Sequence, residues 1–299
     1  GRLQGVEQEG EKTMGKIVIV GSGPAGCSAA LYAARAGQEV VVISMGMGAL
    51  SKAELIQNYY GFEEGITGAE LYRQGVAGAK AVGAEFITAE VVGLDYTGSL
   101  VVQTTEGDYP ADAVILATGA GRIAPKIAGL AEHEGRGVSY CATCDAFFYR
   151  GKTAAVLGSG EYALHEVQAL LPLAGRVILC TNGEPLTADF PEGVEICTEK
   201  LAAVEGEEKV SALRLENGEL LPVEGLFVAL GVAGSAALAR KLGAPVENGR
   251  IVVDEKMQTG IPGLYAAGDC TGGLLQVCKA VYEGALAATE AIKQIRGKK

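Results

Sequence analysis

Short runs of apolar residues alternate with alanine-rich segments and glycine turns along most of the chain. Residues 16–20 are an apolar, β-rich run that ends in a glycine turn, and residues 24–36 have the alanine-rich composition of a helix. Residues 39–43 are a second apolar run, so the order predicts a βαβ unit. Because both runs are continuously apolar rather than alternating, they are typical of strands buried in a parallel sheet.

The same pattern starts again in the middle of the chain. Residues 153–157 predict a strand, 161–171 a helix and 176–180 another strand, so this is a second βαβ unit and a coarse repeat of the first. The pattern also predicts helices at 68–82 and 276–295 and strands within 84–104, 112–119, 210–216, 219–222, 225–231 and 263–269. The sequence therefore predicts an α/β protein with two Rossmann-like, doubly wound domains and a linker near 115–125.

Composition and charge narrow the classes of function. The chain has 299 residues, is 48% hydrophobic and contains 44 glycines, which suits two globular domains with tight turns. It has no run of 18 apolar residues, so it predicts no membrane-spanning helix. The net charge of −11 argues against nucleic acid or an anionic membrane as a general partner. Residues 1–13 are polar and non-periodic, and we interpret them as a tag or a disordered segment.

The seven cysteines favour a reducing compartment. Their number is odd, most lie in apolar surroundings, and no secretory signal follows Met14. We therefore expect a cytoplasmic protein with mostly free thiols. Five cysteines are interpreted as small buried hydrophobic residues: Cys27, Cys180, Cys197, Cys270 and Cys278.

The first glycine turn fits the pattern GxGxxG, after a strand and at the start of a helix. Gly21 permits the tight turn, Gly23 lets the backbone approach a pyrophosphate, and Gly26 lets the helix pack on the strand. The alternative is a glycine turn that binds no ligand. Since residues 43–46 contain no acidic side chain for the ribose hydroxyls, adenosine would have to bind other groups, such as Ser44 or backbone amides.

A second fingerprint, GxGxxA, opens the second unit with Gly158, Gly160 and Ala163. A bound 2′-phosphate would need arginines near the end of the unit's second strand, but residues 180–184 offer no basic residue in reach. Tyr162 adds bulk where a nicotinamide or flavin ring would pass. We interpret the unit as folded but not as an evident NADPH site, and a purely structural scaffold stays open as the alternative.

Cys141 and Cys144 lie between the two fingerprints with the spacing CxxC. This spacing lets two sulfurs reach bonding distance across a short turn, and a helix start beside them would lower the pKa of a thiol. Asp145 could hand a proton to a leaving thiolate or cap a helix. Half a zinc site and structural thiols are the alternatives, but no second CxxC or CxxH exists. His133 and His165 are expected at the surface or in packing, and we predict no metal.

These motifs, in this order, resemble those of the low-molecular-weight thioredoxin reductases over nearly all of residues 14–299. The resemblance rests on GSGPAG at 21–26, NYYGF at 58–62, ATG at 117–119, CATCD at 141–145 and GLYAAGDC at 263–270. It implies two Rossmann-like domains, the second inserted into the first, and a homodimer. The implied boundaries are an FAD-binding domain at 14–117 and 235–299, and an inserted pyridine-nucleotide-domain-like unit at 118–234 that carries the CxxC pair.

The resemblance also implies roles for single residues. FAD would reduce the Cys141–Cys144 disulfide, Cys144 would face the flavin, and Cys141 would attack thioredoxin or a similar disulfide protein, with Asp145 as the acid. The inserted domain would rotate on hinges at 119–121 and 231–234. Asp269 would bind the flavin ribitol, and Gln276 and Val277 would lie near the isoalloxazine ring. The full set of expected FAD-binding residues is Gly21, Gly23, Pro24, Ala25, Gly26, Ser44, Asn58, Thr118, Gly119, Asp269, Gln276 and Val277.

The chain departs from the family pattern where NADPH would bind. The phosphate-binding HRRxxxR stretch has no counterpart at 180–186, and GGGDSA has become GSGEYA at 158–163. The chain is therefore similar to the pyridine-nucleotide-independent branch, which includes ferredoxin-dependent flavin thioredoxin reductases and a two-flavin member. GGQL near the flavin has also changed, to Gly-Ala-Leu at 48–50.

Our leading hypothesis is a cytoplasmic, FAD-dependent protein-disulfide reductase whose donor is reduced ferredoxin rather than NADPH. Three alternatives stay open: NADH or NADPH at an altered site, a second FAD at Gly158 and Gly160, and a redox-sensing flavoprotein without turnover. Because the net charge of −11 would repel an acidic ferredoxin, a local basic patch is required. One candidate patch, which could equally be a solvated helix end, is Lys279, Lys293, Arg296, Lys298 and Lys299.

Overall fold

The computed structural model describes residues 14–120 and 125–297. The predicted tag at 1–13, the hinge residue Gly121 and the patch residues Lys298 and Lys299 lie outside the described residues. None of the helices in the two described ranges combines the length and the apolar character that a membrane crossing needs.

Five parallel strands form the first sheet, in the order β18-β7-β1-β2-β3. They are β1 (Lys16–Val20), β2 (Glu39–Ser44), β3 (Glu85–Thr88), β7 (Ala113–Leu116) and β18 (Leu264–Ala266). Nearly every side chain of β1 and β7 is buried, which explains why these strands are apolar without alternation. The last strand comes from near the C-terminus, so the two ends of the chain build one sheet.

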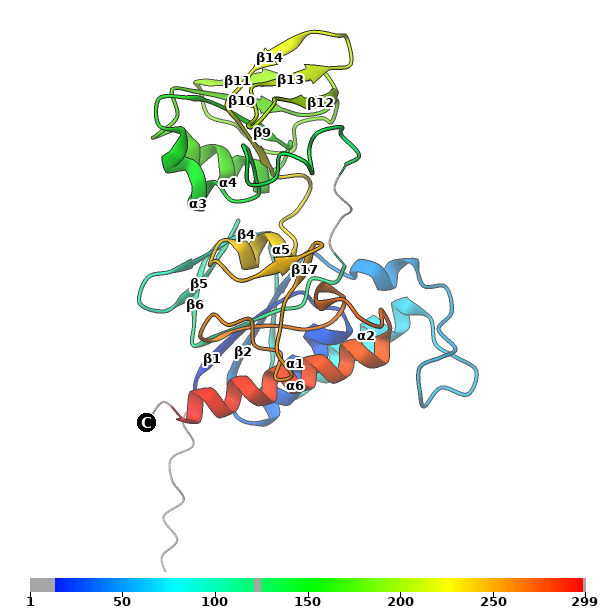
Figure 1. Cartoon of the computed structure of the whole chain (residues 1–299). Helices are drawn as coiled ribbons and strands as arrows, with labels where there is room; N and C mark the ends of the chain where they lie inside the picture. The colour runs from blue at the N-terminus through cyan, green and yellow to red at the C-terminus, as the bar shows by residue number, and fades with distance from the viewer. Residues whose placement is uncertain (1–13, 121–124, 298–299) are drawn as a thin grey trace, which may run out of the picture.

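Three helices accompany this sheet in the lower lobe of Figure 1, where α1 lies along α6. They are α1 (Pro24–Arg35), α2 (Gly68–Ala81) and α6 (Val277–Gly297). Helix α1 begins at a proline, which has no backbone N–H. No hydrogen bond is lost by this, because the first N–H groups of a helix have no acceptor within the helix. The two long helices approach closely because Gly284 has no side chain: a Cβ there would lie 2.1 Å from the Ala25 carbonyl oxygen.

The second sheet also has five parallel strands, in the order β11-β10-β9-β15-β8, and lies in the upper lobe of Figure 1. They are β8 (Val138–Ser139), β9 (Thr153–Leu157), β10 (Arg176–Cys180), β11 (Val194–Cys197) and β15 (Gly225–Val228). Helix α3 (Ala142–Asp145), the 3₁₀ turn η2 (Ala146–Tyr149) and helix α4 (Glu161–Leu170) belong to this lobe.

Short antiparallel sheets and turns complete the fold. One sheet contains β4 (Val91–Tyr96), β5 (Leu100–Thr104) and β6 (Gly107–Ala111); another contains β12 (Leu201–Glu205), β13 (Ala212–Leu215) and β14 (Leu220–Pro222). A hairpin is formed by β16 (Val246–Glu247) and β17 (Arg250–Ile251). The remaining elements are α5 (Ser235–Arg240), η1 (Gly48–Lys52) and η3 (Asp269–Thr271).

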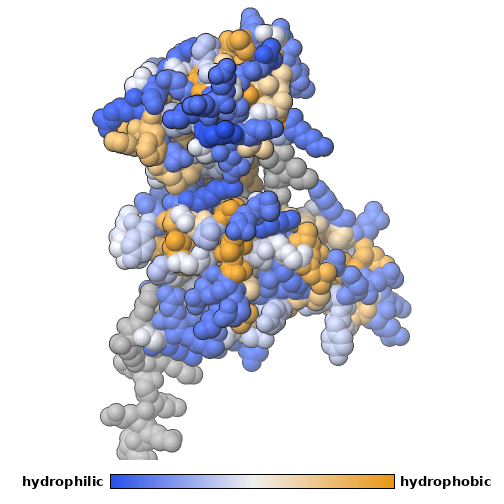
Figure 2. Space-filling view, viewed as in Figure 1, coloured by the Kyte–Doolittle hydropathy of each residue, from blue (hydrophilic) through white to orange (hydrophobic). Residues whose placement is uncertain are grey.

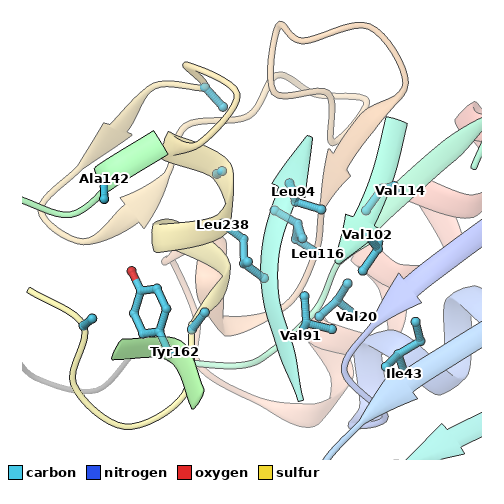
Figure 3. Packing of buried hydrophobic residues seen from close by; sticks show 14 of the residues in the cluster. Val20, Ile43, Val91, Leu94, Val102, Val114, Leu116, Ala142, Tyr162 and Leu238 are labelled. Carbon is cyan, nitrogen blue, oxygen red and sulfur yellow. The ribbon is translucent and has the colours of Figure 1, made fainter. Parts of the chain in front are cut away.

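One buried apolar cluster joins the two lobes. Leu238 of α5 lies between Ala142 and Tyr162 of the upper lobe and Leu94 and Leu116 of the lower lobe (Figure 3). The sheet β4-β5-β6 also approaches α4, since a Cβ on Gly93 would lie 3.0 Å from Cε1 of His165. The lobes therefore share a packed interface in this arrangement.

The chain crosses between the lobes twice, and the two crossings meet. The Thr118 hydroxyl lies 2.7 Å from the Ser235 hydroxyl. The backbone N–H of each residue also donates to the other residue's hydroxyl, at 3.1 and 2.8 Å. Ser235 is buried, so these hydrogen bonds hold both connections at one point.

The predicted α/β class with parallel, Rossmann-like sheets is confirmed. The predicted hairpin at 210–222 is present as β13 and β14. Pattern reasoning did not predict β6, β8, β11, β12 or α5. These elements are two to six residues long, too short for periodicity to show, and β6 contains Pro110.

Candidate functional site

The first glycine turn has the geometry of a dinucleotide-binding loop. The Gly21 N–H donates to the Ile43 carbonyl at 2.9 Å, and a Cβ on Gly21 would lie 2.2 Å from the Ala117 carbonyl oxygen. A Cβ on Gly26 would lie 1.8 Å from the Gly21 carbonyl oxygen. Nothing lies within 4 Å of the Cβ position of Gly23, so this glycine faces open space at the start of α1.

A cavity of about 320 Å³ lies in front of this turn. Nine of the residues predicted to bind the cofactor line it: Gly23, Pro24, Ala25, Asn58, Thr118, Gly119, Asp269, Gln276 and Val277. Two of them, from segments far apart in the chain, are joined by a 2.9 Å hydrogen bond from the Asn58 amide to the Gln276 amide oxygen. Four segments that are far apart in the sequence therefore converge on one cavity.

The other three predicted cofactor residues lie behind the cavity wall. Gly21 and Gly26 shape the turn, and the Ser44 hydroxyl lies 2.7 Å from the Ser22 hydroxyl. Ser22 lines the cavity in its place. The cavity fits an elongated dinucleotide such as FAD, because the N–H groups at the start of α1 and the open space at Gly23 suit a pyrophosphate.

Cys141 and Cys144 form a disulfide with Cα atoms 5.3 Å apart. Helix α3 begins between them, with Cys141 as the N-cap residue whose sulfur accepts from the Cys144 N–H at 3.1 Å. Cys141 is buried and Cys144 is exposed. The Cys144 sulfur lies 3.5 Å from the Arg240 carbonyl oxygen, at the end of α5.

The Asp145 carboxylate lies close to the disulfide through Ser139. The Ser139 hydroxyl donates to Asp145 at 2.7 Å and accepts from the Cys141 N–H at 3.1 Å. The predicted acid is therefore linked to the Cys141 backbone by one hydroxyl group. Ser139 was not singled out from the sequence, and no local motif marks it.

The structure does not bring the disulfide to the cavity. The residues described as lining the cavity include neither cysteine. In this arrangement the disulfide lies against the end of α5 instead.

The second glycine turn repeats the backbone geometry of the first but is covered by the chain itself. The Gly158 N–H donates to the Cys180 carbonyl at 3.0 Å. The Thr187 N–H donates to the Ser159 carbonyl at 2.9 Å, and a Cβ on Gly160 would lie 3.0 Å from the Thr187 hydroxyl oxygen. The loop after β10 therefore occupies the space above the turn.

Two further residues bear on the second turn. Tyr162 is buried and donates to the Tyr140 carbonyl at 3.2 Å, so its ring belongs to the core. The expectation that no basic residue is in reach was wrong, because Lys200 follows β11 and its Cε lies 3.1 Å from the Cβ position of Gly183. Lys200 is twenty residues from Cys180 in sequence, and only the parallel pairing of β10 and β11 brings it close.

A family model described as pyridine nucleotide-disulphide oxidoreductase matches residues 15–284. The chain belongs to this family. A thioredoxin reductase of Aquifex aeolicus is 35% identical, with 95% of this chain and 94% of that protein covered. The chain is therefore a disulfide oxidoreductase of the low-molecular-weight thioredoxin reductase type.

Two solved structures are similar to this reductase. The crystal structure of the atypical thioredoxin reductase TRi from Desulfovibrio vulgaris Hildenborough has a TM-score of 0.89 at 40% identity, covering 95% of this chain and 98% of that one. A ferredoxin-flavin thioredoxin reductase from Clostridium acetobutylicum has a TM-score of 0.72 at 35% identity, covering 95% and 99%.

A buried ion pair holds the disulfide segment of the reductase against α5. The Glu166 carboxylate of α4 accepts from the Ala142 N–H at 2.5 Å and pairs with the Lys241 ammonium, which follows α5. The two side chains are 1% and 0% exposed. Burial raises the pKa of Glu166, but a hydrogen bond from His165, the charge of Lys241 and the Ala142 N–H outweigh it and hold the pKa below its usual range.

Sequence reasoning missed this pair because its partners are 75 residues apart and no motif contains them. Both histidines make local contacts. The His133 ring is hydrogen-bonded to the Gly129 and Gly206 carbonyls, and the His165 ring lies 3.3 Å from the Glu166 carboxylate.

The predicted basic patch on α6 loses one member. The Lys279 ammonium is turned inward, where it donates to the Gly268 carbonyl at 2.8 Å and pairs with Glu283 at 3.1 Å. Lys279 therefore stabilises the turn that carries Asp269. Lys293 is exposed but pairs with Glu290, whereas the Arg296 guanidinium donates to the uncharged Ala36 carbonyl and keeps its positive charge.

Proposed function

We propose that this reductase passes two electrons from FAD to the Cys141–Cys144 disulfide and on to thioredoxin or a similar disulfide protein, with reduced ferredoxin rather than NADPH as its donor. The observation that supports a donor other than NADPH is the position of Thr187. This residue lies over the second glycine turn, where a pyridine nucleotide would place its phosphates. The similarity to a ferredoxin-flavin thioredoxin reductase of Clostridium acetobutylicum supports it.

FAD is assigned to the cavity between 14–117 and 235–299, with 118–234 as the inserted unit. The N–H groups at Gly23 and the start of α1 would hold the pyrophosphate, and Asp269 the ribitol. Once the donor has reduced it, bound FAD would supply the electron pair that reduces the disulfide. Asn58 and Gln276 hold each other across the cavity and would position the ring end of the cofactor.

The reduced cysteines carry out thiol–disulfide exchange. The Cys141 thiolate attacks one sulfur of the partner's disulfide, and the other partner sulfur leaves as a thiolate that takes a proton. Cys144 then attacks Cys141 in the mixed disulfide, which reforms the Cys141–Cys144 bond and releases the second partner thiolate. Asp145, which is linked to the Cys141 N–H by two hydrogen bonds through Ser139, would supply a proton when it is in its protonated form.

This exchange requires the upper lobe to move. Cys141 is only 4% exposed, so a protein disulfide cannot reach it in this arrangement. Rotation would separate Cys144 from Arg240 and Glu166 from Lys241. Gly119 and Gly231 both have positive φ and lie in the two connections, and we propose them as hinge residues.

The partner would dock beside α3. The 3₁₀ turn η2 presents Phe147 and Phe148, each 67% exposed, directly after the disulfide. Figure 2 shows apolar colouring over this side of the upper lobe. An exposed apolar pair beside a redox disulfide suits a protein partner rather than a small thiol. A homodimer and a cytoplasmic location complete the proposal, the latter supported by the five free cysteines.

A pyridine nucleotide is the second candidate donor, and Lys200 is the observation that favours it. Its side chain lies against Gly183, with Cε 3.1 Å from the Cβ position of that glycine, near the end of β10 where a 2′-phosphate would be bound. One exposed lysine would give weak, salt-dependent binding, in contrast to an arginine cluster.

The deciding experiment is anaerobic titration of the purified protein. The number of FAD molecules bound per chain is measured first. One FAD per chain supports the interpretation that the second turn is covered. Two would mean that the Thr187 loop opens for a second flavin. The flavin absorbance is then followed as NADPH, NADH or chemically reduced ferredoxin is added. Bleaching by ferredoxin alone, followed by thioredoxin reduction, supports the proposal. Rapid bleaching by NADPH or NADH contradicts the donor, and bleaching without any disulfide turnover points to a redox sensor.

A further inference from the structure

Two cysteines that the proposed reaction does not use lie side by side in the second sheet. Cys180 ends β10, Cys197 ends β11, and the two are direct partners in the parallel ladder. Both side chains pack on the same apolar cluster, so they point to the same face of the sheet. Cys180 is fully buried and Cys197 is half-buried.

The internal repeat shows that this pair replaces an apolar one. In the first sheet the corresponding ladder partners are Ile43 and Ile87. The correspondence is set by backbone contacts, because the first glycine of each turn donates to Ile43 in one unit and to Cys180 in the other. Ile87 is half-buried, as Cys197 is. Where packing alone is satisfied by two isoleucines, the second unit carries two thiols.

The strand geometry allows these thiols to be joined. Neighbouring strands lie about 4.8 Å apart, and natural disulfides span Cα distances of about 4.4–6.8 Å. We propose that Cys180 and Cys197 are a second dithiol of this chain, which low-molecular-weight disulfides convert to an intramolecular disulfide.

The reaction balances as two exchanges. The Cys197 thiolate, on the accessible side, attacks one sulfur of the small disulfide, and the other half leaves as a thiolate that takes up a proton. The Cys180 thiolate then attacks the Cys197 sulfur, the new bond forms, and the second half leaves with the other proton. Burial, followed by the neighbouring Cys197, raises the pKa of Cys180, so the second exchange is the slower one.

The Cys180–Cys197 disulfide would restrain the loop that covers the second glycine turn. It would close a loop over 181–196, which contains Thr187 and its hydrogen bond to Ser159. Oxidation would therefore hold the Thr187 loop over Gly160, and reduction would leave it free to open. This inference does not depend on which donor reduces the flavin.

The test uses the full-length protein with its Cys141–Cys144 disulfide intact. Hydroxyethyl disulfide is added in native buffer, remaining thiols are alkylated after denaturation, and unreduced peptides are mapped by mass spectrometry. The expected result is a linked pair of peptides containing Cys180 and Cys197, with alkylation of both lost in parallel. Cys27 and Cys270, which are buried without a cysteine partner, keep their alkylation.

Matched variants separate the outcomes. Cys278→Ser removes an exposed thiol and is expected to leave the new link unchanged. Cys197→Ser is expected to keep Cys180 fully alkylated, and Cys180→Ser to leave Cys197 as a hydroxyethyl mixed disulfide. The proposal is overturned if wild-type Cys197 carries only that mixed disulfide while Cys180 stays free. It is also overturned if both stay free, or if either links to another cysteine.

Discussion

The two βαβ units share one backbone design and differ in what covers their glycine turns. In the first, the Gly21 N–H donates to Ile43 at 2.9 Å; in the second, the Gly158 N–H donates to Cys180 at 3.0 Å. Above Gly23 there is open space, whereas Thr187 lies over Gly160. A glycine fingerprint therefore specifies the turn, and a neighbouring loop decides whether a ligand can reach it.

The second unit carries the reactive sulfurs instead. Its edge strand β8 leads into Cys141 and α3, and α4 supplies Glu166 beneath them. The first βαβ unit contributes to the cavity, and its cysteine, Cys27, is buried. Burial raises the pKa of this thiol to about 12, so it is not reactive. Under the proposed function, cofactor binding and disulfide exchange are divided between two copies of one motif.

The sharpest test of this division is removal of a single sulfur. Either Cys141→Ser or Cys144→Ser is expected to lower the turnover of a disulfide substrate by about three orders of magnitude or more, because the exchange needs both atoms. FAD content should stay at the wild-type value, since neither cysteine lines the cavity. Turnover is measured with thioredoxin and with the donor that bleaches the flavin in the anaerobic titration. Turnover at the wild-type rate in both variants contradicts the assignment.

The contact between the units is tested by Lys241→Met. This change leaves the Glu166 carboxylate buried without its cation, which costs about 3–5 kcal/mol. We expect a lower denaturation midpoint and faster alkylation of Cys141 after reduction, because the pair bridges the lobes. The double variant Glu166→Gln/Lys241→Met removes both charges and should recover most of the loss. Additive losses would mean that the two side chains are not coupled.

The same pair predicts how stability depends on pH. The pKa of Glu166 in the folded protein is lowered, so its contribution is complete above the unfolded value of about 4.3. It is lost as the pH falls through the lower, folded value. Thermal midpoints measured between about pH 6 and about pH 3 should fall less steeply in Glu166→Gln than in wild type. If the thermal midpoints of the two proteins fall in parallel, another group is responsible for the loss of stability at low pH.

The comparison of the two turns is sharpened by Gly23→Val and Gly160→Val. No heavy atom lies within 4 Å of the Cβ position of Gly23, so we expect the apoprotein to keep its stability. FAD affinity should fall about ten- to a hundredfold, because the side chain would displace the pyrophosphate. Gly160→Val should leave FAD content and turnover unchanged. Equilibrium dialysis with FAD measures both, and equal losses would show that the second turn also holds cofactor.

The smallest effect is expected from Thr187→Ala. The backbone hydrogen bond to Ser159 remains, and only the hydroxyl over Gly160 is lost, so the free energy of unfolding should change by about 0.5 kcal/mol or less. If the covered turn is a relic, NADPH should still fail to bleach the flavin. Rapid bleaching in this variant would show that the hydroxyl alone blocks the nucleotide.

Pattern reasoning predicted the elements with strong periodicity and long apolar runs, including β1, α1, β2, β9, α4 and β10. It also identified nine residues that line one cavity, because the motifs that carry them are local. It did not identify Lys200 or Lys241, and Lys279, predicted to belong to a basic patch, points inward instead. The partner of a charged side chain can be predicted from the sequence only when the two residues are close together in the chain.

By itself, the sequence determined the turns, the CxxC pair and the family, since each depends on residues within a few positions of one another. The tertiary structure decided which turn is open, that Cys141 is buried, and that Glu166 meets Lys241. It also decided that Cys180 faces Cys197. The physical reason is that strand pairing and lobe packing bring together side chains far apart in the chain, and burial then sets their charge and reactivity.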